Sequence, residues 1–191
     1  MTNIQTNEQL TESSELKLAV RREVRRRISA MDAETKEAAA RSIFSRIEQL
    51  PHFCDAKCIA LFAAMKDEVP TAEALRRWSD MGKRIVVPRV EGDIMNFYRY
   101  SPEAMHEGAF GIDEPTGEEL CSAGDIDLII VPARAFTISG IRLGRGGGFY
   151  DKYMSLPDFR AHKTGIAFAC QIFDSLPADT HDITVDEVVF A

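Results

Sequence analysis

The sequence has no long apolar segment. Its longest apolar runs, such as residues 58–65 and 128–132, are far shorter than the ~20 residues that a membrane-spanning helix needs. The first ten residues lack the basic start and the apolar core of a signal peptide, and the chain carries a net charge of −7. Such an acidic protein is not expected to bind nucleic acid or an anionic membrane through its overall charge. We therefore expect a cytoplasmic protein with no membrane or nucleic-acid partner.

Cysteine is also scarce, with four residues in 191. Only Cys54 and Cys58 lie close together, and no second pair completes a zinc-site pattern. We interpret all four cysteines as reduced thiols, and a metal held by His52, Cys54 and Cys58 is the less favoured alternative. Because 45% of the residues are hydrophobic, a chain of this length can bury a core without disulfides. We expect one domain over residues 1–191, with residues 1–12 flexible.

Helix and strand patterns alternate along the chain. The first helix is expected to begin at Ser13 or Ser14 and to end near Ser29, and the second runs from residue 32 to about residue 50, where Pro51 ends it. Strands are predicted at residues 58–62, 84–87, 94–100, 126–131, 164–168 and 185–190, with Pro88 ending the second of them. Further helices begin near Pro70 and Gly148. This alternation predicts a three-layer αβα, Rossmann-like fold with a mainly parallel, mixed central sheet.

The most distinctive segment is the glycine-rich stretch 140–151. Four of the five residues 144–148 are glycine, and Arg142 and Arg145 accompany them. Glycine lets backbone N–H groups approach an anion closely, a helix N-terminus attracts negative charge, and arginine supplies planar donors. We favour phosphate binding over a loop in which glycine only makes turns. Asp151, one turn into the expected helix, could hold Mg²⁺ against those phosphates.

This stretch lacks the sequence of two common phosphate-binding motifs. No Lys-Ser/Thr pair follows the glycines, which excludes a Walker A motif, and Phe149 stands where G-x-G-x-x-G needs its last glycine. The motif therefore indicates phosphate binding, but it does not assign the chain to either of these nucleotide-binding superfamilies.

Basic residues concentrate near the N-terminus. Residues 15–27 contain six basic and two acidic side chains, a local charge of +4, which leaves −11 on the rest of the chain. Lys17, Arg21 and Arg25 lie four residues apart and share one helix face. The spacing leaves open whether this face is solvated or directed at the same polyanion as the glycine loop. No aromatic residues are interleaved with it, so a nucleic-acid function is weakly supported.

Two further segments carry carboxylates. Asp67-Glu68-Val-Pro-Thr71 follows a predicted strand, and ligands of open α/β sheets bind beyond such strand ends. There Glu68 could accept hydrogen bonds from a ligand, away from the glycine loop, or the segment is simply a helix start. Asp182, after His181, is by itself more typical of a turn.

Taken together, these motifs resemble the 5-formyltetrahydrofolate cyclo-ligases, also called methenyltetrahydrofolate synthetases. The resemblance runs from Lys17 to about Val189. It rests on Lys17-x-x-x-Arg21, Asp67-Glu68-x-x-Thr71, Gly111-Ile-x-Glu-Pro115, the strand 126–132, Arg142-Leu-Gly-Arg-Gly-Gly-Gly-Phe-Tyr-Asp151, Gly165-Ile-Ala167 with Gln171, and Leu176-Pro177…His181-Asp182…Val185-Asp186.

The resemblance implies cyclisation of 5-formyltetrahydrofolate to 5,10-methenyltetrahydrofolate with ATP and Mg²⁺, release of ADP and phosphate, and a phosphorylated formyl (iminium phosphate) intermediate. It implies Arg145 and Tyr150 as catalytic residues and Asp151 and Asp182 as metal ligands. It implies that ATP is bound by Lys17, Arg21, Arg142, Leu143, Gly144, Arg145, Gly146, Gly147, Gly148, Phe149 and Tyr150, and folate by Ala63 on the preceding strand, Glu68, Arg145, Gly146, Gly147, Gly148 and Phe149.

The sequence departs from the family pattern at a few positions. Ala133-Arg-Ala-Phe136-Thr137 stands in place of Gly-x-x-Phe-Asp, Phe149 in place of the usual Tyr, and Phe190 in place of a Thr. Three alternatives stay open: a non-catalytic nucleotide-binding homologue, a phosphosugar isomerase or transferase with a buried general base near the glycine loop, and an RNA-associated protein that uses the arginine-rich helix. We expect a monomer.

Overall fold

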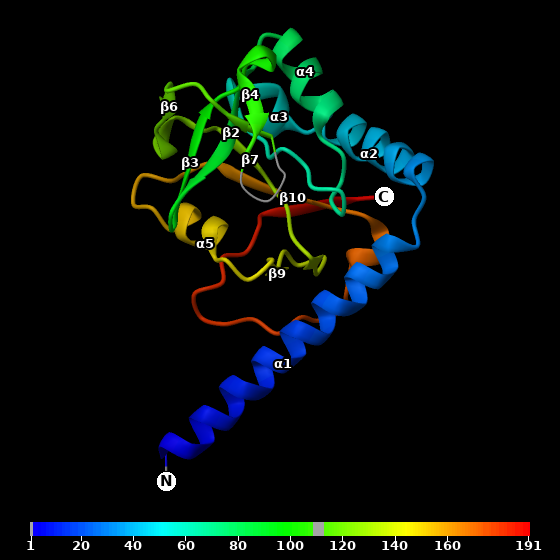
Figure 1. The fold of residues 1–191 in the computed structure, drawn as a ribbon, viewed down its shortest axis with the longest axis vertical. Coiled ribbons are helices and arrows are strands. Elements are labelled where there is room, and N and C mark those ends of the chain that lie inside the picture. Colours follow the sequence, from blue (N-terminus) through cyan, green and yellow to red (C-terminus); the bar gives the residue numbers. More distant parts are fainter. Residues whose placement is uncertain (1, 109–112) are drawn as a thin grey trace.

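The centre of the fold is a twisted sheet. The computed structural model describes residues 2–108 and 113–191, and within them seven strands form this sheet in the order β11-β10-β7-β1-β2-β3-β6 (Figure 1). The strands are β1 (Cys58–Ala60), β2 (Arg84–Glu91), β3 (Ile94–Arg99), β6 (Leu120–Cys121), β7 (Leu128–Val131), β10 (His162–Ala167) and β11 (Glu187–Phe190). The pairs among β11, β10, β7, β1 and β2 are parallel, and β3 and β6 are antiparallel. The predicted mainly parallel, mixed sheet is confirmed.

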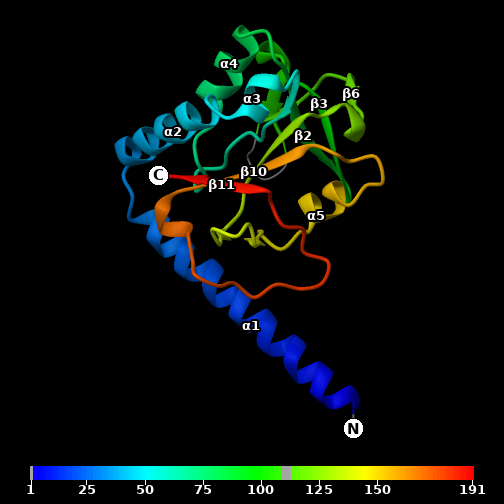
Figure 2. The same cartoon turned by 180° about the vertical axis from the view of Figure 1, so that it is seen from behind.

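Helices cover both faces of the sheet. On one face lie α2 (Ala33–Ile47), α3 (Pro51–Asp55), α4 (Ala72–Asp80) and the second half of α1 (Thr2–Ser29), and on the other lies the short α5 (Phe149–Met154). The first turns of α1 extend beyond the rest of the chain, and the C-terminus lies beside α2 (Figures 1 and 2). Two-stranded ribbons, β4 (Met105–Glu107) with β5 (Asp113–Pro115) and β8 (Ala135–Phe136) with β9 (Arg142–Leu143), and the 3₁₀ turns η1 (Pro102–Ala104), η3 (Ala123–Asp125) and η4 (Ala169–Gln171) complete the described elements.

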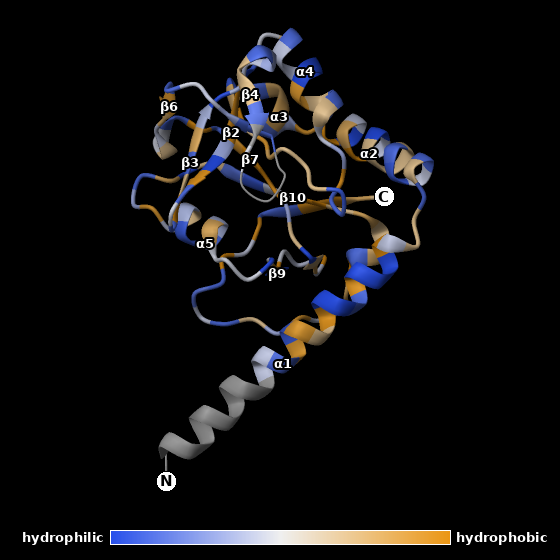
Figure 3. Cartoon of the chain, viewed as in Figure 1, coloured by the Kyte–Doolittle hydropathy of each residue, from blue (hydrophilic) through white to orange (hydrophobic). Residues whose placement is uncertain are grey.

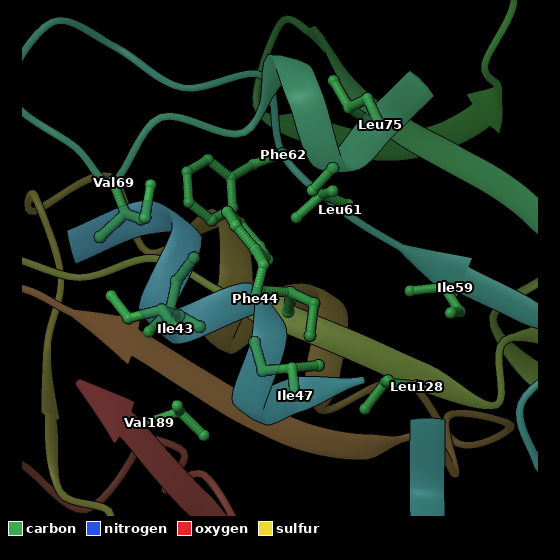
Figure 4. Close-up of a cluster of buried hydrophobic side chains, with 14 of the residues drawn as sticks. Ile43, Phe44, Ile47, Ile59, Leu61, Phe62, Val69, Leu75, Leu128 and Val189 are labelled. Atoms are coloured by element: carbon green, nitrogen blue, oxygen red, sulfur yellow. The ribbon is translucent and has the colours of Figure 1, made fainter. Parts of the chain in front are cut away.

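Alternation along the strands builds the two cores. Ile59 and Leu128 face α2, whose Ile43, Phe44 and Ile47 pack against the sheet (Figure 4). The next residues along each strand, such as Ala60 and Ile129, face the layer of α5 instead. Each fully buried aliphatic side chain contributes about 1.5–3 kcal/mol relative to exposure. The described turns of α1, together with α2 and α4, carry both hydropathy colours in Figure 3, as expected of helices with one buried face. The three-layer arrangement follows from these two buried surfaces.

Three predicted boundaries differ from the structure by more than two residues. The first helix begins at Thr2 and not at Ser13 or Ser14, because residues 2–12 contain neither glycine nor proline to end it. Pro51 does not end the second helix, which stops at Ile47, but begins α3, where a missing N–H costs nothing. Pro88 lies inside β2. Because β1 pairs only with residues 84–86, the absent N–H of Pro88 breaks no hydrogen bond on that side.

The strand order changes direction at β1. This strand has β2 on one side and β7 on the other, so the chain that leaves β1 and the chain that leaves β7 turn to opposite sides of the sheet. In open α/β folds such a switch point opens a crevice beyond the carboxyl ends of the strands. The fold therefore brings the loop 61–71 together with the glycine-rich segment.

The remaining predictions concern the four cysteines, the Gly-Ile-x-Glu-Pro motif and the lack of a membrane-spanning helix. The four cysteines are free thiols, as predicted. Gly111 and Ile112 of the Gly-Ile-x-Glu-Pro motif lie outside the described residues. None of the described helices has the length and apolar character to cross a membrane.

Candidate active site

A cavity of about 720 Å³ lies at the switch point, a size typical of small-molecule sites. Its walls come from α1, from the loops after β1 and β7, from the strands β2, β3, β5 and β9, from the first turn of α5, and from residues 179–182 before β11. Every residue that the sequence assigned to ATP, folate or metal lines it, namely Lys17, Arg21, Ala63, Glu68, the ten residues from Arg142 to Asp151, and Asp182. The structure brings the predicted site together, and the individual roles stay predictions.

The glycine loop is shaped by backbone conformations and contacts that exclude side chains. Gly146 has φ +113° and Gly148, the N-cap of α5, has φ +68°, a region that residues with a Cβ rarely adopt. A Cβ at Gly147 would lie 2.9 Å from the ring of Phe149. Among the described residues, no backbone partner accepts a hydrogen bond from the N–H groups of Gly146, Gly147 or Gly148. These donors are open to an anion.

Arg145 joins the glycine loop to the loop after β1. Its Nε lies 2.9 Å from Glu68 Oε1, and its Nη2 lies 2.5 Å from Asp67 Oδ1. The other oxygen of Asp67 accepts from Arg134. The expectation that Glu68 lies away from the glycine loop is therefore wrong, because β1 and β7 are neighbours in the sheet. Ala63 lies in the same loop, beyond the end of β1 at Ala60, and not on the strand.

The basic face of α1 points into the cavity. Lys17 is 9% exposed, and its Nζ lies 2.7 Å from Asp179 and 2.7 Å from Asp182. Arg21 donates through Nε to the carbonyl of Gly144 at 2.9 Å. Burial lowers the pKa of Lys17, but the two carboxylates outweigh it and the pKa is raised. Of the two interpretations of this face, a purely solvated one is excluded for Lys17 and Arg21.

The two predicted metal ligands are already paired with cations. Asp151 Oδ1 accepts from Arg142 at 2.5 Å and from the backbone N–H of Ile183 at 3.0 Å, which places it beside Asp182. Burial raises the pKa of Asp182, but the backbone N–H of Asp179 and the charge of Lys17 outweigh it, so the pKa is lowered. Asp182 is thus charged at neutral pH, and the oxygens of both carboxylates are the kind of ligand that Mg²⁺ takes.

Sequence reasoning missed a third acid here. Among the described residues, the potential metal ligands that gather in a group of three or more are Asp179, His181 and Asp182, with ligand atoms within 4.8 Å of one another. The alternative site at His52, Cys54 and Cys58 is not among such groups, and the His52 ring instead stacks on His162 at 3.6 Å. The position of Asp179, three residues before Asp182, was the signal available in the sequence.

Tyr150 keeps its proton. Burial, with a smaller contribution from the negative charge of Glu68, raises the pKa of its hydroxyl, so at neutral pH this group is available as a hydrogen-bond donor and does not act as a base. The Arg142 guanidinium lies 5.9 Å from the centre of the ring.

The opposite side of the cavity is largely apolar. Its walls include Phe62, Pro88, Val90, Met95 and Phe149, together with the buried carboxylate residue Glu114. Sequence reasoning did not assign the residues of β2 and β3 to the site, because only the hairpin geometry brings them to the cavity.

This site can be compared with known proteins. A family model described as the 5-formyltetrahydrofolate cyclo-ligase family matches residues 13–191. The chain belongs to this family. It is therefore an enzyme of the cyclo-ligase type. The 5-formyltetrahydrofolate cyclo-ligase of Mus musculus is 29% identical over 188 residues, covering 91% of this chain and 93% of the relative. That of Escherichia coli (strain K12) is 28% identical over 176 residues, covering 87% and 95%.

Solved structures of cyclo-ligases share the fold. The 5,10-methenyltetrahydrofolate synthetase of Aquifex aeolicus has a TM-score of 0.82 and 35% identity, covering 92% of this chain and 89% of its own. The synthetase of Mycoplasma pneumoniae has a TM-score of 0.72 and 26% identity, covering 91% and 97%.

The departures of this cyclo-ligase from the family pattern have local explanations at two positions. Thr137 is buried, and its Oγ1 accepts from the backbone N–H of Ile141 at 3.0 Å. The hydroxyl thus closes the β8–β9 turn, where the pattern has a carboxylate. Phe149 packs its ring against Gly147, a contact that needs no hydroxyl. The structure offers no explanation for Phe190.

Proposed function

We propose that this cyclo-ligase converts 5-formyltetrahydrofolate to 5,10-methenyltetrahydrofolate by means of ATP and Mg²⁺, with release of ADP and phosphate. The observation that carries the proposal is the position of Arg145. It lies within the glycine loop and is hydrogen-bonded to Glu68 of the loop after β1, the loop to which folate binding is assigned. A phosphoryl group that is transferred from ATP to the formyl oxygen must pass close to a residue that borders both binding regions, and Arg145 is such a residue.

ATP is assigned to the basic side of the cavity. Lys17, Arg21 and Arg142 reach it from α1 and β9, and the free N–H groups of the glycine loop add neutral donors. In the structure these cations are balanced by nearby carboxylates such as Asp182 and Asp151. A nucleotide phosphate can take the place of these carboxylates, so that each buried cation keeps an anionic partner when its carboxylate is released.

Folate is assigned to the apolar side. A planar pterin ring fits between side chains such as Phe62, Met95 and Phe149, and Ala63 leaves room beside it. The Glu68 carboxylate can accept hydrogen bonds from the N–H groups of the ring. Arg145 and residues 146–149 border both sides, so they contact both substrates.

The reaction then needs positioning more than a protein nucleophile. The formyl oxygen attacks the γ-phosphorus, the bond to the ADP oxygen breaks, and the product is an iminium phosphate. N10 attacks the formyl carbon and loses its proton. The C–O bond breaks and releases phosphate, which leaves the conjugated methenyl ring. Phosphoryl transfer of this kind depends on alignment and charge neutralisation.

Two side chains would act on the transferred group. Arg145 would neutralise charge that develops on the phosphoryl oxygens, a contribution of about 3–4 kcal/mol for one preorganised donor. Tyr150, which keeps its proton, would donate a hydrogen bond to an oxygen of the reacting group. Asp151 and Asp182 would hold Mg²⁺, and the bound ion supplies further neutralisation of the phosphates. A monomeric state, a cytoplasmic location and the lack of a nucleic-acid partner stay predictions.

The deciding experiment follows near-UV absorbance of the conjugated product in a mixture of the protein, Mg²⁺, ATP and 5-formyltetrahydrofolate. We expect product and ADP in equal amounts, and no product when ATP or folate is omitted or when EDTA removes Mg²⁺. A protein that binds ATP in calorimetry but forms no product would be the non-catalytic homologue. Turnover without ATP would exclude the phosphorylated intermediate.

A further inference from the structure

Asp67 has two arginine partners that are supported differently. Arg134 has an 8% exposed side chain, and its loop is anchored because Gln171 Nε2 donates to the carbonyls of Ala133 and Arg134 at 2.9 and 3.0 Å. Arg145 has a 32% exposed side chain and stands between two glycines. Arg134 is therefore the fixed partner of Asp67, and Arg145 is the partner that can leave.

The ion pair between Arg134 and Asp67 becomes important for the stability of the Asp67 carboxylate when Arg145 turns towards a ligand. Asp67 is partly buried, and a desolvated carboxylate that loses its only cation is costly. Burial raises the pKa of Asp67, but its hydrogen bonds with Arg145 and Arg134 outweigh it, so the pKa is lowered and the group is charged at neutral pH. With Arg134 in place, Asp67 keeps one partner after Arg145 has left. The family pattern Gly-x-x-Phe-Asp does not specify the residue at position 134.

We propose that Arg134 is a positioning residue whose ion pair with Asp67 stabilises that carboxylate when Arg145 moves to the phosphates of ATP. The inference rests on the proposed function, because it takes ATP to be the target of Arg145. Arg134 acts on the nucleotide through Asp67 and sets how readily Arg145 is released. Without it, Asp67 would hold Arg145 as its sole partner and compete with the phosphates.

A double-mutant cycle tests this coupling. The dissociation constant of Mg·ATP is measured by calorimetry for the wild type, Arg134→Met, Asp67→Asn and the double variant. We expect Arg134→Met to weaken ATP binding about tenfold in the wild-type background and less than twofold in the Asp67→Asn background, since coupled residues are not additive. Arg134→Lys should recover most of the affinity because it keeps the charge. If Arg134→Met does not fold, Arg134→Gln replaces it in the same cycle.

The other outcomes overturn the proposal in distinguishable ways. An equal loss of affinity in both backgrounds would mean that Arg134 contacts the nucleotide itself. Equal losses for ATP and 5-formyltetrahydrofolate, with a lower melting temperature, would mean a structural role. Arg41→Met, an exposed arginine on α2, is the matched control and should leave ATP binding unchanged. If the wild type binds no ATP, the proposed function fails and this inference with it; if it is active but shows no coupling, only this inference fails.

Discussion

Nε of Arg145 lies 2.9 Å from Oε1 of Glu68, which is 77 residues earlier in the chain. This contact joins the glycine loop between β9 and α5 to the loop after β1. The side assigned to nucleotide and the side assigned to folate therefore share one ion pair. A substitution on either side is therefore expected to change ligand affinity on the other side as well.

Replacing Arg145 with Ala should lower turnover by about 10²–10³-fold, because one preorganised cation is lost from the transition state. The fold should persist, since Arg145 is partly exposed. The measurement is the rate of methenyl product formation at saturating substrates, with a melting curve to confirm folding. The exposed Arg160 serves as a control when changed to Ala. A folded Arg145→Ala protein with normal turnover would contradict the assignment.

Glu68→Gln should weaken folate binding at least about tenfold, because a hydrogen bond to a charged group contributes about 1.5–3 kcal/mol. ATP affinity should stay the same or rise, since Arg145 loses one of its two competing carboxylates. Calorimetric titration with each ligand separates the two effects. An equal or larger loss for ATP would place Glu68 in the nucleotide or metal site instead.

Arg21→Ala should raise the KM for ATP about tenfold, as expected from a loss of about 1.4 kcal/mol, and should leave folate affinity within about twofold. Its Nε supports the carbonyl of Gly144 in the glycine loop. Lys17→Ala should act in the same direction, and Arg25→Ala, whose side chain is exposed, should have a smaller effect. Steady-state kinetics on the three variants provide the measurement. Normal ATP kinetics in Arg21→Ala and Lys17→Ala would show that the face binds no nucleotide.

The wild-type protein should not bind RNA. The chain outside residues 15–27 carries −11, which repels a long polyanion but tolerates one triphosphate chelated by a metal ion. A titration with labelled RNA at two salt concentrations tests this. Tight binding with a steep salt dependence would restore the RNA-associated alternative.

The Lys17–Asp182 pair should stabilise the fold over a wide but bounded pH range. The pKa of Asp182 is lowered, so its contribution is complete above the unfolded value of about 3.9 and is lost as the pH falls through the folded value. The pKa of Lys17 is raised, so its contribution is complete below about 10.4 and is lost as the pH rises through the folded value.

Melting temperatures measured between pH 3 and pH 7 check the acid side of this expectation. The wild type should lose stability below about pH 4, and Asp182→Asn should be less stable at pH 7 with a smaller drop on acidification. The exposed Asp93, changed to Asn, is the control and should follow the wild type. Parallel curves for the wild type and Asp182→Asn would show that the pair contributes nothing to stability.

The sequence by itself determined the features that depend on neighbouring residues. The start of the second helix at residue 32 and the glycine loop before α5 follow from local backbone chemistry and occur as predicted. Every residue of β1 and β7 is apolar and buried, so their sequences likewise determined strands that are covered on both faces.

Local chemistry was not sufficient to predict element boundaries at two prolines and in the polar residues 2–12, because each of these is compatible with more than one local structure. Pro51 and Pro88 were expected to end elements, but Pro51 begins a helix and Pro88 sits beyond the pairing of β1. In each case the outcome depends on what lies beside the residue in space, which the sequence pattern does not state.

Only the tertiary structure decided which charges meet. The motifs containing Glu68 and Arg145 were both visible in the sequence, yet they were expected to lie apart, and Arg134 and Asp179 were not assigned to the site at all. Their contacts depend on β1 lying next to β7 and on α1 crossing the loop at residues 179–182. Strand order and helix docking are set by burial of apolar surface across the whole chain, and this non-local free energy leaves no signature at the charged residues that it brings together.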